Sequence, residues 1–304
     1  MLVLAPDGKG IAGIRCAALT IVAAASVLRR HSMEPAGFSR FLSGNRNIYQ
    51  IAPRPNFWKE ARGCRVVDRF VAKLRSRQAL SEEDENLLRQ AGWSQRRYVR
   101  HEVMVRAGER LDHCHLLLSG FAARSQEDSA GNRQIVGISI AGDLLDIHGV
   151  VLGRMEQELV ALSACDVASI PHGEVRGLIL SSVGLLRTFT LQGAIDHAIQ
   201  AAWIQALGSK RGTAKIAHLF CEMQLRLGIV GLATQMGFPM PMSQQELADY
   251  AGMTHVHLNR CLKELRQAGL LAFSSGWAKV LNWEGLKDLA RFDEAYLNLR
   301  LIEV

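Results

Sequence analysis

The stretch that decides the fold runs from Met242 to Leu271 and reads MSQQELADYAGMTHVHLNRCLKELRQAGLL. Ser243 and Glu246 have the Ser-x-x-Glu spacing of a capping box, in which each side chain accepts from the other residue's amide, so a helix begins there. Gly252 ends that helix, and Thr254 is a suitable N-cap for a second one. The stretch therefore predicts two short helices joined by a sharp turn.

The two predicted helices carry apolar residues at the offsets that bury one helix against the other. These positions are Leu247, Ala248, Ala251, Met253, Leu258, Cys261, Leu262 and Leu265. Gly269 is a natural stop for the second helix. An ordinary helical hairpin could share the caps. The small residue, the glycine at the turn and the cap after it together favour a DNA-binding helix-turn-helix.

The outer face of the second helix is predicted to read DNA. Arginine binds guanine in a bidentate manner and asparagine binds adenine, so Arg260 and Asn259 are the strongest candidates for base contacts. Lys263 lies one turn further on and is better suited to phosphate. The full set expected to contact DNA is Ser243, Thr254, His255, Val256, His257, Asn259, Arg260 and Lys263.

The composition is that of a globular protein with room for two domains: 304 residues, 48% of them hydrophobic, and a net charge of +7. The excess positive charge lies before Ala107, whereas the stretch from Met242 to Leu271 is nearly neutral, so the basicity is no DNA signal from the motif. The 6 cysteines are scattered and form no Cys-x-x-Cys pair. No zinc or iron–sulfur site is predicted, and a reduced cytoplasm is the expected compartment.

Residues 1–60 are predicted to be an extension that is either disordered or the product of a mis-assigned start, since Met33 offers an alternative first residue. The apolar run from Ile11 to Leu28 could pass for a short signal or anchor. Arg15 interrupts that run, and a protein that acts on DNA has no need of export. We therefore expect no membrane partner.

The middle of the chain changes from helical to strand periodicity. The segment from Arg62 to Gln90 is predicted to be helical, with a second short helix beginning at Ser81. Short apolar or alternating runs separated by glycine turns follow, and they predict an antiparallel sandwich or jelly roll. The predicted strands lie around Val103–Val105, His115–Leu118, Gln134–Ile140 and Val167–Ile170.

After Pro171 the pattern predicts a helix of roughly two dozen residues. Its apolar stripe consists of Leu191, Ile195, Ala198, Ile199 and Ala202. The stripe has two possible partners, the jelly roll of its own chain or the same helix of a second chain. The small alanines allow two such helices to pack closely, and a two-fold dimer suits a palindromic DNA site, so the homodimer is the favoured prediction.

The order of these parts resembles the Crp/Fnr superfamily of bacterial transcription regulators, from about Tyr98 to the C terminus. The motifs that carry the resemblance are Arg106-Ala-Gly108, His115-Leu-Leu-Leu-Ser-Gly120, Ala141-Gly-Asp-Leu144, Val160-Ala161 before Asp166-Val-Ala-Ser-Ile-Pro171, and the helix-turn-helix. The resemblance implies an α+β fold with an antiparallel jelly-roll sensor domain like those that bind cyclic nucleotides, a long dimerisation helix and a C-terminal winged helix-turn-helix domain. The expected boundaries are 1–60, 61–180, 181–208 and 209–304, with the wing over Phe273–Leu281. It also implies double-stranded DNA and RNA polymerase as partners.

Departures from the family pattern affect the expected effector. Family members that bind a cyclic nucleotide have a Gly-Glu pair and then an Arg-Ser pair, where this chain has Asp146-Ile147 and Met155-Glu156. Without the arginine, and with an added carboxylate, a nucleotide phosphate meets repulsion, so no cyclic nucleotide is expected to bind. These four residues remain the candidates for an effector site. The family's usual recognition-helix glutamate is replaced by Val256, which can make only apolar base contacts.

Three other functions are considered for this sequence: a haem sensor, an enzyme and an effector-free or partner-controlled protein. A haem sensor would use His101, His113, His115 or His148 as an axial ligand, although lone histidines are usually surface or core residues, so no cofactor or metal is predicted. An enzyme would use Cys114 with a histidine. Strand alternation turns Cys114 away from its neighbours, which disfavours both catalysis and a metal site there. An effector-free protein, or one controlled by a protein partner, stays open as the third function.

Overall fold

The computed structural model describes residues 67–131 and 133–299, so the predicted extension over residues 1–60 lies outside the described residues. The described part opens with the short helices α2 (Asp68–Arg75) and α3 (Glu82–Gln90). Ser81 caps α3, because its Oγ accepts from the Asp84 amide at 3.0 Å. The second helix predicted to begin at Ser81 is therefore confirmed.

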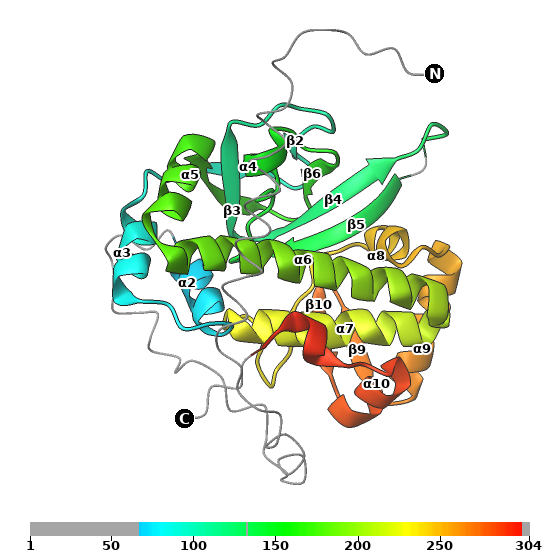
Figure 1. The fold of residues 1–304 in the computed structure, drawn as a ribbon. Helices are drawn as coiled ribbons and strands as arrows, with labels where there is room; N and C mark the ends of the chain where they lie inside the picture. The colour runs from blue at the N-terminus through cyan, green and yellow to red at the C-terminus, as the bar shows by residue number, and fades with distance from the viewer. Residues whose placement is uncertain (1–66, 132, 300–304) are drawn as a thin grey trace, which may run out of the picture. The chain divides into compact units, whose positions relative to one another are not determined.

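An antiparallel jelly roll follows these helices (Figure 1). One sheet has the order β1-β7-β3, formed by Ser94–Tyr98, Cys165–Pro171 and His113–Ser119. The other has the order β2-β6-β4-β5, formed by Val103–Val105, Glu158–Ala161, Phe121–Glu127 and Arg133–Ile140. All neighbouring strands in both sheets pair antiparallel, which confirms the predicted fold class.

Helix α4 (Gly149–Leu152) lies between β5 and β6 of the jelly roll, and helices α5 (His172–Ser181) and α6 (Val183–Ser209) connect the jelly roll to the C-terminal part. Ser182 separates α5 from α6, because its extended backbone breaks the helix and its Oγ accepts from the amides of Gly184 and Leu185. The long helix α6 has 27 residues, slightly longer than the predicted one. No helix in the described ranges is long and apolar enough to cross a membrane.

The C-terminal part is a winged helix-turn-helix. Its elements are α7 (Gly212–Ile229), β8 (Phe238–Pro239), α8 (Gln244–Ala251), α9 (His255–Gln267), β9 (Leu271–Ser274), β10 (Trp277–Val280), α10 (Trp283–Ala290) and η3 (Glu294–Leu297). Strands β9 and β10 form the predicted wing hairpin. Ser275 and Gly276 at its tip have φ of 51° and 73°, as a two-residue hairpin turn of this kind requires.

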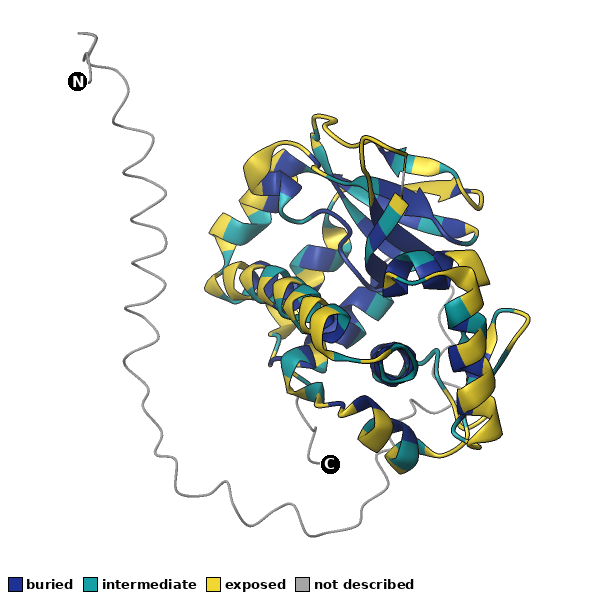
Figure 2. Ribbon diagram, turned by 90° about the vertical axis from the view of Figure 1, so that its right-hand side faces the viewer, coloured by how far each residue is buried: buried dark blue, intermediate teal, exposed yellow. Residues whose placement is uncertain are grey.

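One apolar cluster is shared by the jelly roll, the long helix and the helix-turn-helix. It contains buried residues of β4 and β5, Trp203 of α6, and Leu247 and Leu258 of the helix-turn-helix. Figure 2 shows these buried faces in dark blue and the outer faces of the helices in yellow. Burial of apolar surface is the main term that stabilises a fold, so the shared cluster stabilises the packing of the helix-turn-helix against the jelly roll.

Candidate nucleic-acid interface

The turn between α8 and α9 is fixed by four local features. The Glu246 amide donates to Ser243 Oγ at 3.1 Å, and the Ser243 amide donates to Glu246 Oε2 at 2.6 Å, which completes the capping box. Gly252 ends α8 with φ of 58°. Thr254 Oγ1 accepts from the His257 amide at 3.2 Å and caps α9. All three predicted caps are confirmed.

The apolar positions predicted for the two helices face inward. Leu247, Ala248 and Ala251 of α8 are buried, as are Leu258, Cys261, Leu262 and Leu265 of α9, while Met253 in the turn is half-buried. This packing fixes the rotation of α9 about its own axis. The residues between the buried positions are therefore held on the outer surface.

The outward face of α9 presents free donor groups. Thr254, His255, Val256, Arg260 and Lys263 are exposed, and Val256 is 79% exposed. Arg260 and Lys263 form no ion pair with any residue that the structure describes. A guanidinium and an ammonium group on one helix face, both without an anionic partner, suit base edges and phosphates that carry acceptors.

A row of polar side chains joins the two helices on this face. His255 Nε2 lies 3.0 Å from Gln244 Oε1, and Asn259 Nδ2 lies 3.4 Å from His255 Nδ1. Gln244 occupies the first turn of α8, and sequence reasoning did not single it out. Its contact with His255, eleven residues on, depends on the angle between the two helices, which the sequence pattern does not give.

His257 faces the protein rather than the outer surface. Its ring lies so close to Gly212 at the start of α7 that a Cβ on Gly212 would be 2.5 Å from His257 Nε2. His257 shares its side of α9 with the buried Cys261, four residues on. The predicted DNA contact of His257 stays a prediction, and its ring lies beside Gly212, whereas Gln244 lies exposed beside His255.

Comparisons with known proteins match both halves of this arrangement. The Crp-like helix-turn-helix domain matches residues 214–289, and the cyclic nucleotide-binding domain matches residues 95–182. The nitrogen fixation regulation protein FixK of Bradyrhizobium diazoefficiens is 30% identical over 166 residues, which cover 53% of this chain and 66% of FixK, just under two thirds of its length. The chain belongs to the Crp/Fnr superfamily.

Two further relatives agree. The transcriptional activator protein FnrL of Cereibacter sphaeroides is 26% identical over 188 residues, 58% of this chain and 72% of FnrL. The structure of FixK2 from Bradyrhizobium japonicum has a TM-score of 0.58 and 21% identity, and covers 65% of this chain and 96% of that one, which shows a common fold. The predictions of the Crp/Fnr family and of a DNA-binding transcription regulator rather than an enzyme are thereby confirmed.

In this Crp/Fnr protein two of the four predicted effector residues are engaged inside the chain. Asp146 is fully buried and accepts from the amide and the Nδ1 of His115 at 2.7 and 2.6 Å. Met155 is also fully buried, and its Sδ lies 3.1 Å from His148 Nε2. Burial lowers the pKa of His148, which favours the neutral ring in this contact.

The other two predicted effector residues are at or near the surface. Ile147 is half-buried, and Glu156 is exposed and forms an ion pair with Arg154 at 2.8 Å. Asp146 and Met155 therefore serve the packing of the jelly roll, and of the four candidates only Ile147 and Glu156 lie at or near the surface. Each oxygen of Asp146 already accepts a bond from His115, which holds the carboxylate inside the chain.

The face of the long helix α6 that was predicted to meet a second chain is not the exposed one. Ile195 is only 3% exposed and packs within its own chain. The remaining stripe residues, Leu191, Ala198, Ile199 and Ala202, are half-buried. The expectation that Ile195 faces a second chain is therefore wrong.

A different face of α6 is exposed. Its members recur every seven residues as Val183, Thr190, His197 and Ile204. Val183 and Ile204 are 80% and 69% exposed although both are apolar. Residues seven apart lie on one side of a helix, so these four form one exposed face of α6, which we call the seam.

Proposed function

We propose that this Crp/Fnr protein acts as a homodimer that binds a palindromic operator, with one α9 helix in the major groove of each half-site. The observation that carries the proposal is the polar row of the exposed Gln244, His255 and Arg260 and the half-buried Asn259, held by the capped turn. Such a row can bind base edges along one groove. Dimeric proteins of this kind place their half-sites about one helical turn apart.

The exposed seam of α6 supports the dimer. Val183, Thr190, His197 and Ile204 repeat along it, and the small Ala194 and Ala201 are also exposed. Small residues between larger ones allow two helices to approach closely, and a two-fold axis pairs the seam with itself. The dimer face that we propose is therefore this seam, in place of the stripe that includes the buried Ile195.

The contacts around Met155 and Glu156 support a regulator whose effector is not a cyclic nucleotide. A nucleotide phosphate would meet the Glu156 carboxylate instead of an arginine, and the neighbouring Asp146 is already bonded by His115. Control by a protein partner, or no effector at all, fits these contacts better. A haem-dependent sensor is less well supported, because His115 and His148 both have partners within the chain.

The proposal implies further partners and a compartment. A regulator that binds promoters works beside RNA polymerase, and we propose RNA polymerase as a partner of the DNA-bound dimer. The four described cysteines, Cys114, Cys165, Cys221 and Cys261, are free and buried, as suits the reduced cytoplasm in which we place the protein.

Selection of bound sequences from random DNA tests the proposal. The purified chain should enrich a palindromic motif with a guanine in each half-site, and sedimentation of the complex should give two chains per site. Binding to random DNA should weaken steeply with salt, since phosphate contacts release counterions. Enrichment of no sequence, or of a motif without two-fold symmetry, would contradict the proposed mode of binding.

A further inference from the structure

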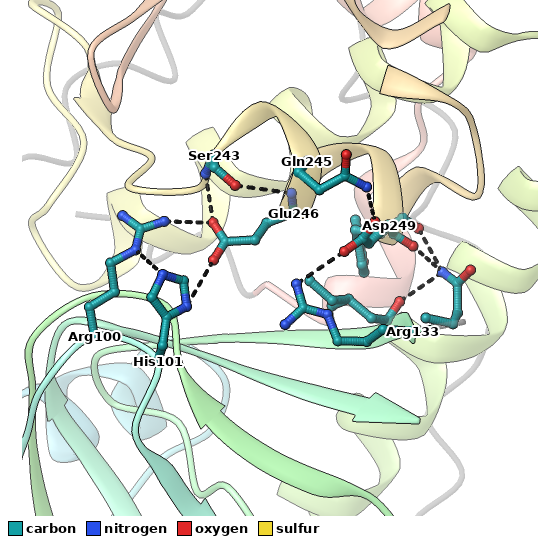
Figure 3. Close-up of polar contacts among 10 residues, drawn as sticks. Arg100, His101, Arg133, Ser243, Gln245, Glu246 and Asp249 are labelled. Atoms are coloured by element: carbon teal, nitrogen blue, oxygen red, sulfur yellow. Dashed lines mark hydrogen bonds and ion pairs between the residues drawn. The ribbon is translucent and has the colours of Figure 1, made fainter. Parts of the chain in front are cut away.

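Helix α8 contacts two parts of the jelly roll, the loop after β1 and the start of β5, and Figure 3 shows its acidic side chains pointing toward the strands. The first contact joins the end of β1 to the start of α8. Arg100 Nη2 donates to Glu246 Oε2 at 2.7 Å. Glu246 is only 2% exposed and is the same residue that completes the capping box of α8. One carboxylate thus serves both the helix start and the contact between domains.

His101 extends this first contact. Arg100 Nε donates to His101 Nε2 at 3.0 Å, so a neutral His101 ring carries its proton on Nδ1. That Nδ1 lies 3.7 Å from Glu246 Oε1, a buried oxygen with no hydrogen-bond partner among the described residues. His101 adopts φ of 67°, which is uncommon for a residue with a Cβ and is maintained where surrounding contacts require it.

The second contact lies one turn further along α8 (Figure 3). Arg133 at the start of β5 forms an ion pair with Asp249, Nη2 to Oδ2, at 3.0 Å. The neighbouring Gln134 donates from Nε2 to the Asp249 carbonyl oxygen and, at 3.4 Å, to that of Tyr250. Two separate parts of the jelly roll, the loop after β1 and the start of β5, therefore contact successive turns of the same helix.

The start of α8 does not need these contacts for its own stability. The Ser243 amide already satisfies Glu246 Oε2 in the capping box, so Arg100 adds a link between domains rather than a helix cap. While both contacts are in place, Arg260 and Lys263 on α9 remain exposed. The Arg100–Glu246 and Arg133–Asp249 contacts therefore leave the outer face of α9 accessible to DNA.

We propose that Arg100 and Arg133 are positioning residues for DNA binding, an inference that rests on the proposed function. They hold α8, and through the tight α8–α9 turn the recognition helix, in the orientation that fits the operator. Loss of either contact lets the helix-turn-helix leave that orientation, and the apparent operator affinity then falls in proportion to the fraction of molecules that remain competent to bind. The jelly roll thereby controls DNA affinity through Arg100, which follows β1, and Arg133, which begins β5.

The first experiment compares Arg100→Gln and Arg133→Gln with Arg97→Gln in the full chain. Arg97 is an exposed arginine on β1, three residues before Arg100 and 3.8 Å from Asp166, and is the matched control. We expect each of the first two variants to bind the selected operator about five- to tenfold more weakly, with unchanged base preference and an unchanged dimer. Arg97→Gln should bind as the wild type does.

A charge exchange separates positioning from a general loss of positive charge. Arg133→Asp and Asp249→Arg should each weaken operator binding, and the double variant should restore it to within about twofold of the wild type, because the ion pair re-forms with reversed polarity. Hydrogen exchange of the amides over Gln244–Ala251, measured without DNA, should be faster in the single variants and normal in the double variant.

The outcomes distinguish this inference from the proposed function. Wild-type affinity in both Arg100→Gln and Arg133→Gln, or a double variant as weak as its parents, would overturn the positioning role while leaving operator binding intact. A wild-type chain that binds no operator would overturn the proposed function and the positioning role together.

Discussion

Arg226 Nη2 donates to Asp143 Oδ2 at 2.7 Å, which joins α7 of the winged helix to the turn that follows β5. Lys73 of α2 pairs with Oδ1 of the same carboxylate, and the Ile140 amide donates to Oδ2 at 2.9 Å. These two cations hold the pKa of Asp143 well below its usual range, despite full burial. One acidic residue therefore ties three parts of the chain together.

Replacement of this carboxylate should be costly. Asp143→Asn would leave the buried Lys73 and Arg226 without their shared anion, and we expect the free energy of unfolding to fall by about 3 to 5 kcal/mol. Denaturant titration would measure the loss. Glu156→Gln is the control, because its exposed pair with Arg154 should contribute less than about 1 kcal/mol. Equal small losses in both variants would show that the buried pairs contribute little.

His218 should make the protein less stable in mild acid. Burial lowers the pKa of His218 to about 4, among the rings of Trp203, Phe292 and Tyr296. The unfolded chain takes up this proton near pH 6.5 and the folded chain only near pH 4, so stability falls as the pH drops through that window, by up to about 3 kcal/mol. His218→Phe should flatten the decline in denaturation midpoint between these pH values. An unchanged slope would mean that other groups cause it.

Arg260 and Lys263 should differ in what they contribute to DNA binding. Arg260→Ala is expected to cost about 1 to 3 kcal/mol of specific binding and to relax the preference at one guanine, while Lys263→Ala weakens all sequences alike. Competition binding with single-base operator variants measures both effects. Retained preference at every base in Arg260→Ala would rule out the assigned base contact.

The two apolar residues Ile195 and Ile204 should respond differently to a charge. Ile204→Glu places like charges along the exposed seam of two α6 helices, so a folded monomer with weak DNA binding is expected. Ile195→Glu buries its charge inside one chain and should instead lower the melting temperature of the whole fold. Sedimentation and circular dichroism on both variants test this. A dimeric Ile204→Glu would place the interface on another surface.

Cyclic nucleotides should leave the protein unaffected. A ligand that binds only the folded state must raise its stability, so saturating cyclic AMP or cyclic GMP should produce no shift in melting temperature. The reason is the pair Met155 and Glu156, one fully buried and the other anionic, where a phosphate would need an arginine. A clear upward shift with either nucleotide would show that another residue supplies the positive charge.

The helix-turn-helix could be predicted in detail because its determinants are local. Ser243, Gly252 and Thr254 act on amides within three residues or on their own φ, and the structure confirms each of them. Strands β1, β4 and β6 were not predicted. β1 reads Ser-Gln-Arg-Arg-Tyr and is exposed except at Tyr98, so it shows no apolar alternation from which a strand could be inferred.

Contacts between distant residues could not be predicted from sequence. Arg100 and Glu246 are 146 residues apart, and nothing in either neighbourhood marks them as partners. The exposed face of α6 could not be predicted for another reason. Helix α6 has apolar residues on more than one side, so periodicity alone could not decide whether Ile195 or Ile204 faces outward.

The Lys73–Asp143 pair sets a practical limit on where this protein can be cut. The match to the cyclic nucleotide-binding domain begins at residue 95, which would suggest an expression boundary just before β1. A fragment cut there would lose α2, whose Phe70 and Val71 are buried in the same cluster as Leu116 of the jelly roll. It would also leave Asp143 with a single cation. The shortest stable fragment therefore begins upstream of Asp68, and protease-resistant products should retain α2.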